Sequence, residues 1–470
     1  MAPEGMSPPD VAWVLTSSAL VLLMTPGLAF FYGGLVQGTN VLNTMMMSIM
    51  SMGMTAVLWL FVGFSLAFGS GGGAFIGDFS HVGLSGLESV LWTETKLPAM
   101  LFAIFQMTFA MIASAIISGA VVERMRFSAY VCFTCLWSVL VYAPVCHWTW
   151  GPGGWIDELG AKDFAGGIVV HESTAVSALV LAGLLGPRLD CGRRVQEKQP
   201  HNVPFAILGA SLLWFGWSGF NGGSALAADD TAVLALMNTY QSAAASLVTW
   251  ALLERLQHRH ASSASGMVTG AIVGLVIITP AAGFVTPLGA VAMGAVGTAL
   301  VYPTFQLRLR VDDTLDAFPC HGVGSFVGAC FTGLFAKEGG LLYGGGWKLL
   351  GVQVLAAVAV AIYTAVVTAA IFFVLSRFMA MRVTEDDESA GLDCVCHGEK
   401  AYGEQGAGRS KSDLVSVEKS SGEEVMADLE AQPFSVRSVL WQGKSESQFV
   451  SSQAATSQGK SSLRCHSSLF

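Results

Sequence analysis

Two histidines interrupt long apolar stretches of this chain, and each follows an acidic residue. The run DFAGGIVVHESTAVS carries His171 eight residues after Asp163, and the run DAFPCHGVGSFVG carries His321 five residues after Asp316. Ionisable side chains at membrane depth usually have a function. A neutral imidazole donates through one ring nitrogen and accepts through the other. Two facing histidines could therefore bond to each other and still guide a small polar solute along an apolar lumen.

Asp163 and Asp316 stand near the starts of these two segments. A carboxylate there can accept backbone N–H bonds and interact favourably with the helix dipole. A single buried histidine is more often a hydrogen-bonded core residue than a functional one. Two histidines in corresponding helices of a repeated unit favour a joint function, and the rest of the chain is then the scaffold that positions them.

The composition indicates a polytopic membrane protein. Hydrophobic residues make up 53% of the 470 residues and charged residues only 12%, against roughly 25% charged residues in soluble domains. The mean hydropathy is +0.58. Uncharged runs recur that are longer than the about 20 residues of one membrane helix. The expected fold class is all-α integral membrane, and nothing in the composition points to a nucleic-acid partner.

The apolar runs and their breaks predict eleven transmembrane helices. The uncharged run from 11 to 77 is too long for one helix and divides near Gly33-Gly34. The run from 261 to 307 divides near Thr279-Pro280, because proline disfavours a continuous helix. The predicted spans are two within 11–77, then 97–122, 127–147, 164–185, 203–220 and 231–253, two within 261–307, and finally 317–336 and 349–376.

Basic residues fall mostly in alternate connections between the predicted spans. Ten lie in one set, and this set is expected to face the cytosol: Arg124, Arg126, Arg188, Arg193, Arg194, Lys198, Arg255, Arg259, Arg308 and Arg310. The other set holds Lys96, Lys162, Lys337 and Lys348. We therefore expect an extracytosolic N-terminus and a cytosolic C-terminus, as an odd number of spans requires, in a multi-pass protein of the plasma membrane.

A faint internal repeat divides the membrane part into halves. The run GLAFFYGG in the first span resembles GWSGFNGG in the sixth, and the fifth and tenth spans carry the two histidine motifs. Repeats of five helices each must be inverted relative to each other. We therefore expect two inverted five-helix repeats followed by a long final helix. Substrate sites in such proteins lie near the middle of the membrane, where the repeats meet.

Three segments follow from the change in composition after Arg382. We expect a transmembrane domain over 1–382, a charged cytosolic regulatory segment over 383–404, and a serine-rich, disordered tail over 405–470. The run Cys394-Val395-Cys396-His397 is a weak signal for metal binding, because a structural zinc site usually needs four ligands. We predict neither a metal site nor a cofactor.

An enzyme is the competing class for the histidine motif. His171-Glu172 begins like the metalloprotease pattern HExxH, but Ala175 stands where the second histidine is required. The nucleophile pattern G-x-S-x-G does not occur either. We therefore expect a protein that is not an enzyme.

Several motifs, in order along the chain, resemble the ammonium transporter (Amt/Mep/Rh) family. They are FQMTFA at 105–110, VVERMRFSA at 121–129, DFAGGIVVH at 163–171, WFGWSGFNGGSA at 214–225 and VDDTLDAFPCHGVG at 311–324. The similarity runs from about Trp13 to Tyr402, and DFAGGIVVH resembles the bacterial and Mep-type branch. This resemblance implies an Amt-type channel fold and a homotrimer with one pore in each subunit.

The resemblance also implies roles for particular residues. His171 and His321 match the twin histidines of the pore, and Phe109 and Phe220 match two stacked phenylalanines that close its mouth. Asp163 matches an acid that supports transport without binding the substrate. Trp150 and Ser224, together with Phe109, match the outer site that recruits ammonium. The implied function is recruitment of ammonium at that site, deprotonation, and passage of ammonia, with the proton moving separately or staying outside.

Some features depart from the family or leave alternatives open. Glu172 stands where members commonly have an uncharged residue, and we expect it to face a neighbouring helix or a neighbouring subunit. Val395 replaces a phosphorylatable threonine of some members. Trp217 is expected to serve in packing or in an aromatic belt at the membrane interface. The alternative functions are an ammonium sensor that reports through its tail, and an electroneutral ammonia gas channel of the Rh kind. Expected partners are ammonium, methylammonium, lipid and a cytosolic regulator at the tail.

Overall fold

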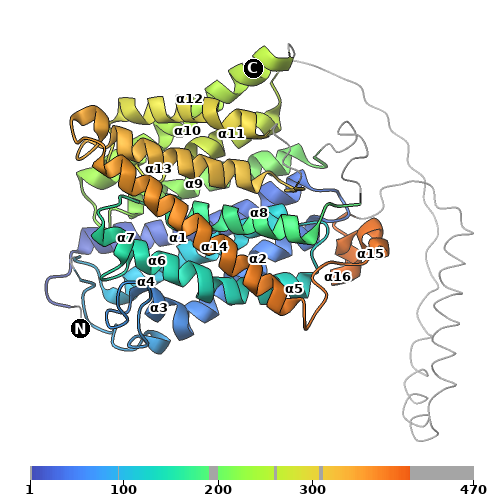
Figure 1. Ribbon diagram of the computed structural model, residues 1–470, viewed down its shortest axis with the longest axis horizontal. Coiled ribbons are helices and arrows are strands. Elements are labelled where there is room, and N and C mark those ends of the chain that lie inside the picture. Colours follow the sequence, from blue (N-terminus) through green and yellow to red (C-terminus); the bar gives the residue numbers. More distant parts are fainter. Residues whose placement is uncertain (1–2, 94, 190–199, 259–261, 306–310, 403–470) are drawn as a thin grey trace, which may run out of the picture. The chain divides into compact units, whose positions relative to one another are not determined.

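Long helices lie side by side in the part of the chain that the structure describes, and they form its membrane spans (Figure 1). The computed structural model describes residues 3–93, 95–189, 200–258, 262–305 and 311–402. Nine helices among these residues have the length and apolar composition of membrane spans. The more polar α10 (Asp230–His258) and the shorter α11 (Ala264–Ile278) complete the count. The predicted fold class is therefore confirmed.

The spans consist of one helix or of two to three consecutive helical pieces. In the first half they are α1 (Pro8–Leu35), α2 (Val41–Leu58) with η1 (Trp59–Gly63) and α3 (Phe64–Phe68), α4 (Ala99–Ile116) with η3 (Ile117–Ala120), α5 (Phe127–Trp137) with η4 (Ser138–Tyr142) and α6 (Ala143–Trp150), and η5 (Gly167–Glu172) with α8 (Ser173–Leu185). In the second half they are α9 (Val203–Gly223), α10, α11, α12 (Pro287–Val301) with η6 (Tyr302–Phe305), and η7 (Phe318–Val323) with α13 (Gly324–Phe335). The last span is α14 (Lys348–Leu375), and α7 (Trp155–Glu158), η2 (Val82–Leu84) and η8 (Leu341–Tyr343) lie in connections.

The first helices of the two halves, α1 and α9, run antiparallel along each other. Near the start of α1, Trp13 donates its indole N–H to the carbonyl of Gly222 at the end of α9, at 3.1 Å. At the other end, the N–H of Asn202 donates to the carbonyl of Gly34, also at 3.1 Å. A Cβ at Gly34 would lie 2.5 Å from the backbone nitrogen of Ala206, so only glycine permits this approach. The antiparallel pair is what inverted repeats require.

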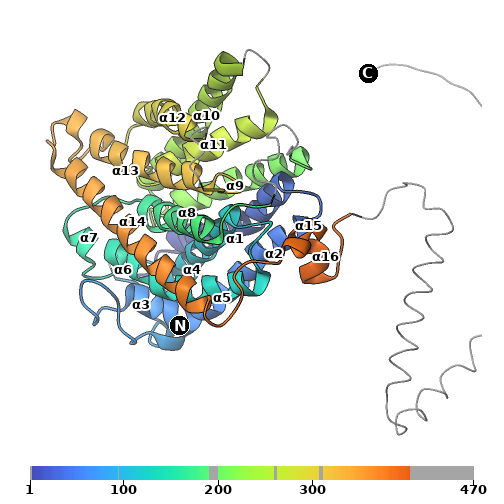
Figure 2. The same ribbon diagram turned by 45° about the vertical axis from the view of Figure 1, so that its right-hand side comes forward.

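The final span α14 crosses both halves on one side of the bundle (Figures 1 and 2). Gln353 on α14 accepts a hydrogen bond from the N–H of Lys162 at 2.7 Å and donates to its carbonyl at 2.8 Å. Further along, the hydroxyl of Thr368 bonds to that of Ser177 on α8 at 2.9 Å. Buried polar contacts thus fix α14 beside the helix that carries His171.

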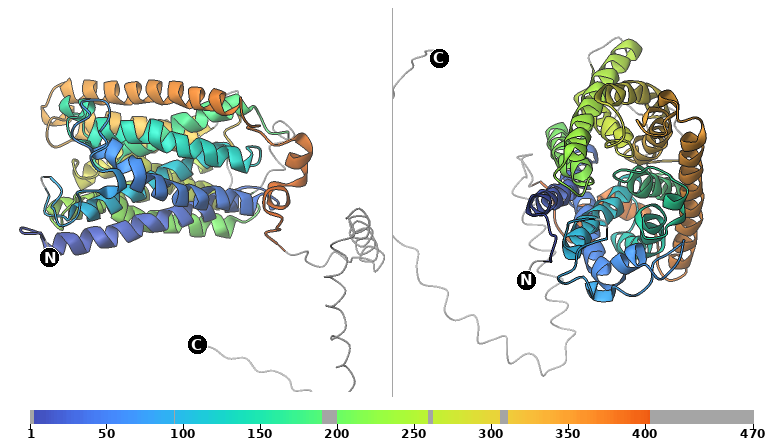
Figure 3. Two further views of the ribbon diagram at one scale, coloured as in Figure 1. Left: turned by 90° about the horizontal axis from the view of Figure 1, so that it is seen from below. Right: turned by 90° about the vertical axis from the view of Figure 1, so that its left-hand side faces the viewer.

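Two short helices after the final span, α15 (Glu385–Ala390) and α16 (Leu392–His397), lie at one end of the bundle, which we call the tail face (Figure 3). Asp393 is buried and accepts a hydrogen bond from the N–H of Asn43 at 2.9 Å. Asn40 accepts one from the N–H of Leu392 at 2.8 Å. The segment is therefore bound to the start of α2 by specific contacts.

Two parts of the sequence analysis fall outside the described residues. One is the serine-rich tail at 405–470. The other comprises six basic residues that entered the prediction of orientation: Arg193, Arg194, Lys198, Arg259, Arg308 and Arg310.

Candidate functional site: a pore with paired histidines

His171 and His321 contact each other at the centre of the bundle. Their Nδ1 atoms lie 3.1 Å apart, and the two rings are stacked at 24°. Their exposed fractions are only 1% and 5%. One Nδ1 must carry the proton that the other accepts. Among the described residues, Nε2 of His171 is buried and has no hydrogen-bond partner, so it is available to a solute.

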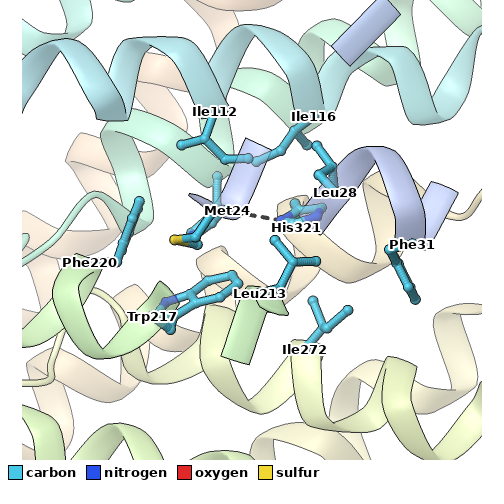
Figure 4. Close-up of a pocket in the computed structure, with 11 residues that line it drawn as sticks. Met24, Leu28, Phe31, Ile112, Ile116, Leu213, Trp217, Phe220, Ile272 and His321 are labelled. Carbon is cyan, nitrogen blue, oxygen red and sulfur yellow. Dashed lines mark hydrogen bonds between the residues drawn. The ribbon is translucent and has the colours of Figure 1, made fainter. Parts of the chain in front are cut away.

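A narrow apolar cavity runs along the histidine pair (Figure 4). Its volume is about 10 Å³, which is about the space needed for one water molecule. Besides His171 and His321 it is lined by Met24, Leu28, Phe31, Ile112, Ile116, Leu213, Trp217, Phe220 and Ile272. The imidazole and indole nitrogens are the only side-chain nitrogen or oxygen atoms in this lining. We call this cavity the lumen.

Asp163 positions the helix that carries His171. Its two carboxylate oxygens accept hydrogen bonds from the four successive backbone N–H groups of residues 166–169, at 2.6–3.1 Å. These groups open η5 and have no partner within the helix. A buried carboxylate that satisfies four of them fixes the start of η5, and with it the imidazole one turn further on.

The corresponding cap on the second pore helix is Asp313, and not Asp316. Asp313 accepts hydrogen bonds from the N–H groups of Ala317 and Phe318 at 3.0 and 2.7 Å, where η7 begins. Asp316 instead has a left-handed backbone (φ 55°). Asp313 precedes His321 by eight residues, the same spacing as between Asp163 and its histidine. That equal spacing was the signal that would have identified Asp313 from the sequence.

Two phenylalanine rings separate the lumen from the end of the bundle opposite the tail face. Phe109 and Phe220 are stacked with centroids 4.2 Å apart and planes 21° from parallel. Both are buried, with exposed fractions of 1% and 0%. The ring of Phe220 lies 5.9 Å from that of His171. The stacked pair therefore borders the lumen through Phe220.

Trp150 and Ser224 lie beside the stacked rings, and we call these four residues the aromatic mouth. The ring of Trp150 stands edge-on to Phe109 with centroids 6.1 Å apart, and its indole N–H donates to the carbonyl of Asp163 at 2.8 Å. The hydroxyl of Ser224 donates to the carbonyl of Phe220 at 2.7 Å. Its only proton is thereby used, so the Ser224 oxygen is left as an acceptor.

Trp217 belongs to the lumen, although the sequence analysis assigned it to packing. Its ring stacks on that of His171 with centroids 5.4 Å apart and planes 22° from parallel. Its indole N–H donates to the hydroxyl of Thr279 at 2.9 Å, so the ring is held in place. Trp217 lies three residues before Phe220 on the same helix, and this spacing places both rings on one helix face.

On its other side the lumen opens towards the tail face. A hollow of about 340 Å³, which we call the vestibule, reaches as far as His321. Its lining is more polar than that of the lumen and includes Tyr32, Glu254, Asp316 and Thr314. His321 lines both spaces, whereas His171 lines only the lumen. The path is therefore closed by aromatic rings at one end and wide at the other.

Known proteins match most of the length of this chain. A family model described as the Ammonium Transporter Family matches residues 12–402. The chain belongs to the ammonium transporter family. An ammonium transporter from Bacillus subtilis (strain 168) is 46% identical over 405 residues, which cover 84% of this chain and 98% of the relative. The chain is therefore a multi-pass integral membrane protein of a transporter family, and not an enzyme.

Solved structures agree with this membership of the ammonium transporter family. The crystal structure of Saccharomyces cerevisiae Mep2 matches with a TM-score of 0.79 at 32% identity, covering 86% of this chain and 94% of that chain. A structure named "Sensor Amt Protein" matches with a TM-score of 0.77 at 30% identity, covering 83% and 98%. The fold is thus shared by Mep2 and by a protein named as a sensor.

In this member of the ammonium transporter family, an ion-pair cluster lies beneath the cap of the second pore helix. Arg188 contacts Glu123 at 2.5 Å and Asp312 at 2.8 Å. Burial alone would raise the pKa of Asp312, but hydrogen bonds and charge from Arg188 lower it well below its usual range. Burial raises the pKa of the adjacent Asp313 to about 6, against the effect of the backbone N–H groups it accepts. The two neighbouring carboxyls therefore titrate in different pH ranges.

The cysteine and histidine run near the end of the described chain has a structural environment. The ring of His397 packs edge-on against Phe127 with centroids 4.9 Å apart, and its Nε2 lies 3.2 Å from the amide oxygen of Asn43. Over the ranges that the structure describes, no group of three or more histidine, cysteine or acidic side chains could hold a metal ion.

Proposed function

We propose that this protein transports ammonium by recruiting NH₄⁺ at the aromatic mouth, passing NH₃ along the lumen, and letting the released proton cross separately, so that the net transport carries charge. The observation that carries the proposal is the hydrogen-bonded pair His171–His321 in an apolar cavity of about 10 Å³. Ammonium is the substrate named for the relatives. The proposal assigns each step of its passage to residues of this chain.

Recruitment rests on the aromatic mouth. A cation over an aromatic ring gains roughly 0.5–2 kcal/mol, depending on how far it is desolvated. Trp150 and Phe109 supply two such rings, and the free acceptor on Ser224 takes one N–H bond of the ion. These contacts are sufficient to gather ammonium from dilute solution. They are far too weak to carry the intact ion further.

Deprotonation follows from the cost of burying a charge. An unpaired ion in an apolar medium costs on the order of tens of kcal/mol in the Born limit. The lumen beyond Phe220 offers no carboxylate and only a few polar nitrogens. Losing a proton removes most of that cost for ammonium. Potassium has no proton to lose and no room for its hydration shell, so it is rejected.

The histidine pair guides the neutral molecule. Because the two Nδ1 atoms share one proton, one ring presents a bare Nε2 to the lumen and the other presents Nε2–H. Ammonia can donate to the first and accept from the second. It then leaves past His321 into the vestibule, where water and polar side chains allow it to regain a proton.

Orientation, assembly and the tail complete the proposal. The distribution of basic residues supports a cytosolic tail face and an extracytosolic aromatic mouth, in the plasma membrane. Family membership supports a homotrimer with one pore in each subunit. The contacts of α15 and α16 with the start of α2 support a regulatory segment over 383–404, which would couple neighbouring subunits and receive a cytosolic regulator.

A sensor is the second candidate, because the structure named "Sensor Amt Protein" shares this fold. Two-electrode recording in oocytes separates the candidates by comparing ammonium, methylammonium and potassium across a range of pH. Saturable ammonium current without potassium current is the expected result. Ammonium binding to the purified protein without flux would indicate a sensor. Flux without current, measured with labelled methylammonium, would indicate an electroneutral channel of the Rh kind.

A further inference from the structure

A second polar contact joins the two pore helices behind the histidine pair. The hydroxyl of Ser325 lies 2.6 Å from Oε2 of Glu172. Glu172 directly follows His171, and Ser325 lies one turn after His321. Both side chains are buried, with exposed fractions of 5% and 0%, and neither lines the lumen. The proposed transport cycle uses neither of them.

The hydrogen bonds of Ser325 indicate whether the carboxyl group of Glu172 carries a proton. The same hydroxyl oxygen lies 3.2 Å from the carbonyl of Gly322 on its own helix. A hydroxyl has one proton and cannot donate fully to both oxygens. A protonated Glu172 resolves the conflict, because it donates to the Ser325 oxygen, which then donates to the carbonyl. The neutral form also avoids burying an unpaired charge at this depth.

The position of the Glu172–Ser325 contact allows it to control the distance between His171 and His321. Within the fully described helices η5–α8 and η7–α13, the side-chain hydrogen bonds that join one to the other are His171–His321 and Glu172–Ser325. The neighbouring hydroxyls of Ser173 and Thr174 bond only to carbonyls of their own helix. On η5–α8 the two contacts lie about 100° apart around the helix, because His171 and Glu172 are consecutive, whereas on η7–α13 Ser325 lies one turn beyond His321 on the same side.

We propose that Glu172 and Ser325 form a positioning pair: a neutral carboxyl hydrogen-bonded to a hydroxyl that holds His171 and His321 at hydrogen-bond distance. The proposal rests on the proposed function only in its effect on transport. The spacing of the histidines is a property of the fold. Without the pair, the histidine contact is the one side-chain hydrogen bond left between these two described helices. The lumen then widens, admits water and loses selectivity.

The test compares Glu172→Ala, Ser325→Ala, their combination and Glu172→Gln. The glutamine amide has the shape of the neutral acid and can both donate and accept, so it should behave like the wild type. Each alanine variant should lower ammonium current per surface protein on the order of tenfold, as expected for a lost buried hydrogen bond. The double variant should be no worse than either single one, because all three remove the same contact.

The ratio of potassium to ammonium current distinguishes positioning from general damage to the fold. It should rise in the alanine variants and stay at the wild-type value in Glu172→Gln. Thr332→Val is the matched control. Thr332 is buried on α13, and its hydroxyl bonds only to the carbonyl of Gly328 on its own helix. This control should leave the ratio unchanged. An unchanged ratio in both alanine variants, or a glutamine variant as impaired as alanine, would overturn the proposal.

A structural measurement makes the test independent of transport. In the purified Ser325→Ala protein, the milder of the two truncations, the Nδ1 atoms of His171 and His321 should move beyond the hydrogen-bonding limit of about 3.5 Å. Nδ1 atoms still at hydrogen-bond distance in this variant would refute the positioning role even if the wild type transports nothing. A wild type without ammonium current would instead refute the proposed function alone.

Discussion

The Nδ1 atoms of His171 and His321 lie 3.1 Å apart, so each imidazole determines the tautomer of the other. The ring that donates through Nδ1 has a bare Nε2, and the ring that accepts has Nε2–H. The lumen therefore presents one acceptor and one donor without any charged group. A carboxylate in the place of either ring would change this balance, and the first prediction follows from that.

We predict that His171→Glu still conducts ammonium but begins to conduct potassium. In the confined, low-dielectric lumen, a carboxylate attracts any cation far more strongly than it does in water. His321→Ala should instead lower ammonium flux with little change in selectivity, because it leaves His171 without its partner and adds no charge. The measurement is potassium and ammonium current in oocytes, normalised to surface protein. A His171→Glu protein that stays closed to potassium while conducting ammonium would contradict the proposed role of the pair.

We predict that Asp313→Ala lowers ammonium current more than Asp316→Ala does. Asp313 caps the helix of His321 by accepting two backbone N–H bonds, and losing a cap costs typically about 1 kcal/mol, with more expected for a buried carboxylate. Asp163→Ala should be at least as severe, since it leaves four backbone N–H groups without their acceptor. Currents at equal surface expression decide the order. If Asp316→Ala lowers the current more than Asp313→Ala, the cap on the helix of His321 does not determine ammonium current.

We predict that Trp150→Leu and Ser224→Ala weaken the apparent affinity for ammonium by about tenfold or less, and lower maximal flux by less. Both changes remove contacts worth about 1–2 kcal/mol at the aromatic mouth and leave the lumen intact. Initial uptake of methylammonium over a range of concentrations separates the two parameters. Trp250→Leu serves as a control for loss of an indole, since Trp250 lines the vestibule instead. Unchanged affinity in both mouth variants would remove these residues from the recruitment site.

The ion pair of Arg188 with Asp312 should stabilise the folded protein at neutral pH, and this contribution should be lost only in strong acid. The pKa of Asp312 is lowered on folding, so its contribution is present above its unfolded value of 3.8 and is lost as the pH falls through the folded value. Asp312→Asn should cost about 3 kcal/mol at pH 7, because it breaks a buried pair.

Thermal unfolding of the purified protein between pH 3 and pH 7 tests this expectation. The difference between wild type and Asp312→Asn should be constant from pH 7 to pH 5 and shrink below about pH 4. The raised pKa of Asp313 acts in the opposite direction between 3.8 and about 6, and the charge of Asp312 contributes to it. Both proteins are therefore compared in an Asp313→Asn background, where this neighbouring carboxyl does not titrate. If the difference in stability between the two proteins already shrinks near pH 6, the pH dependence does not come from Asp312.

Truncation after Tyr402 should retain ammonium current, whereas truncation after Arg382 should reduce it at equal surface expression. The shorter protein loses α15 and α16, and with them the bonds of Asp393 and Leu392 to the start of α2. Asp393→Ala in the full chain should reproduce part of the defect, since its buried carboxylate makes one of those bonds. Equal currents from the two truncations would leave the segment as a passive extension.

The sequence by itself indicated the helical membrane fold, singled out the two buried histidines and determined the membership of the family. Hydropathy and the positions of glycine and proline are local properties, because burying backbone in lipid forces each apolar run into a helix regardless of its neighbours. Asp163 could be recognised in the same way, as it caps the helix that it precedes.

Only the tertiary structure decided which side chains meet across helices. Trp217 has an ordinary place in an apolar span, and it became part of the lumen because α9 turns that face towards His171. Glu172 and Ser325 are 153 residues apart, and neither residue alone indicates the other. Such contacts depend on the rotation and depth at which two helices cross. Those are set by close packing over the whole bundle, which no local pattern of residues specifies.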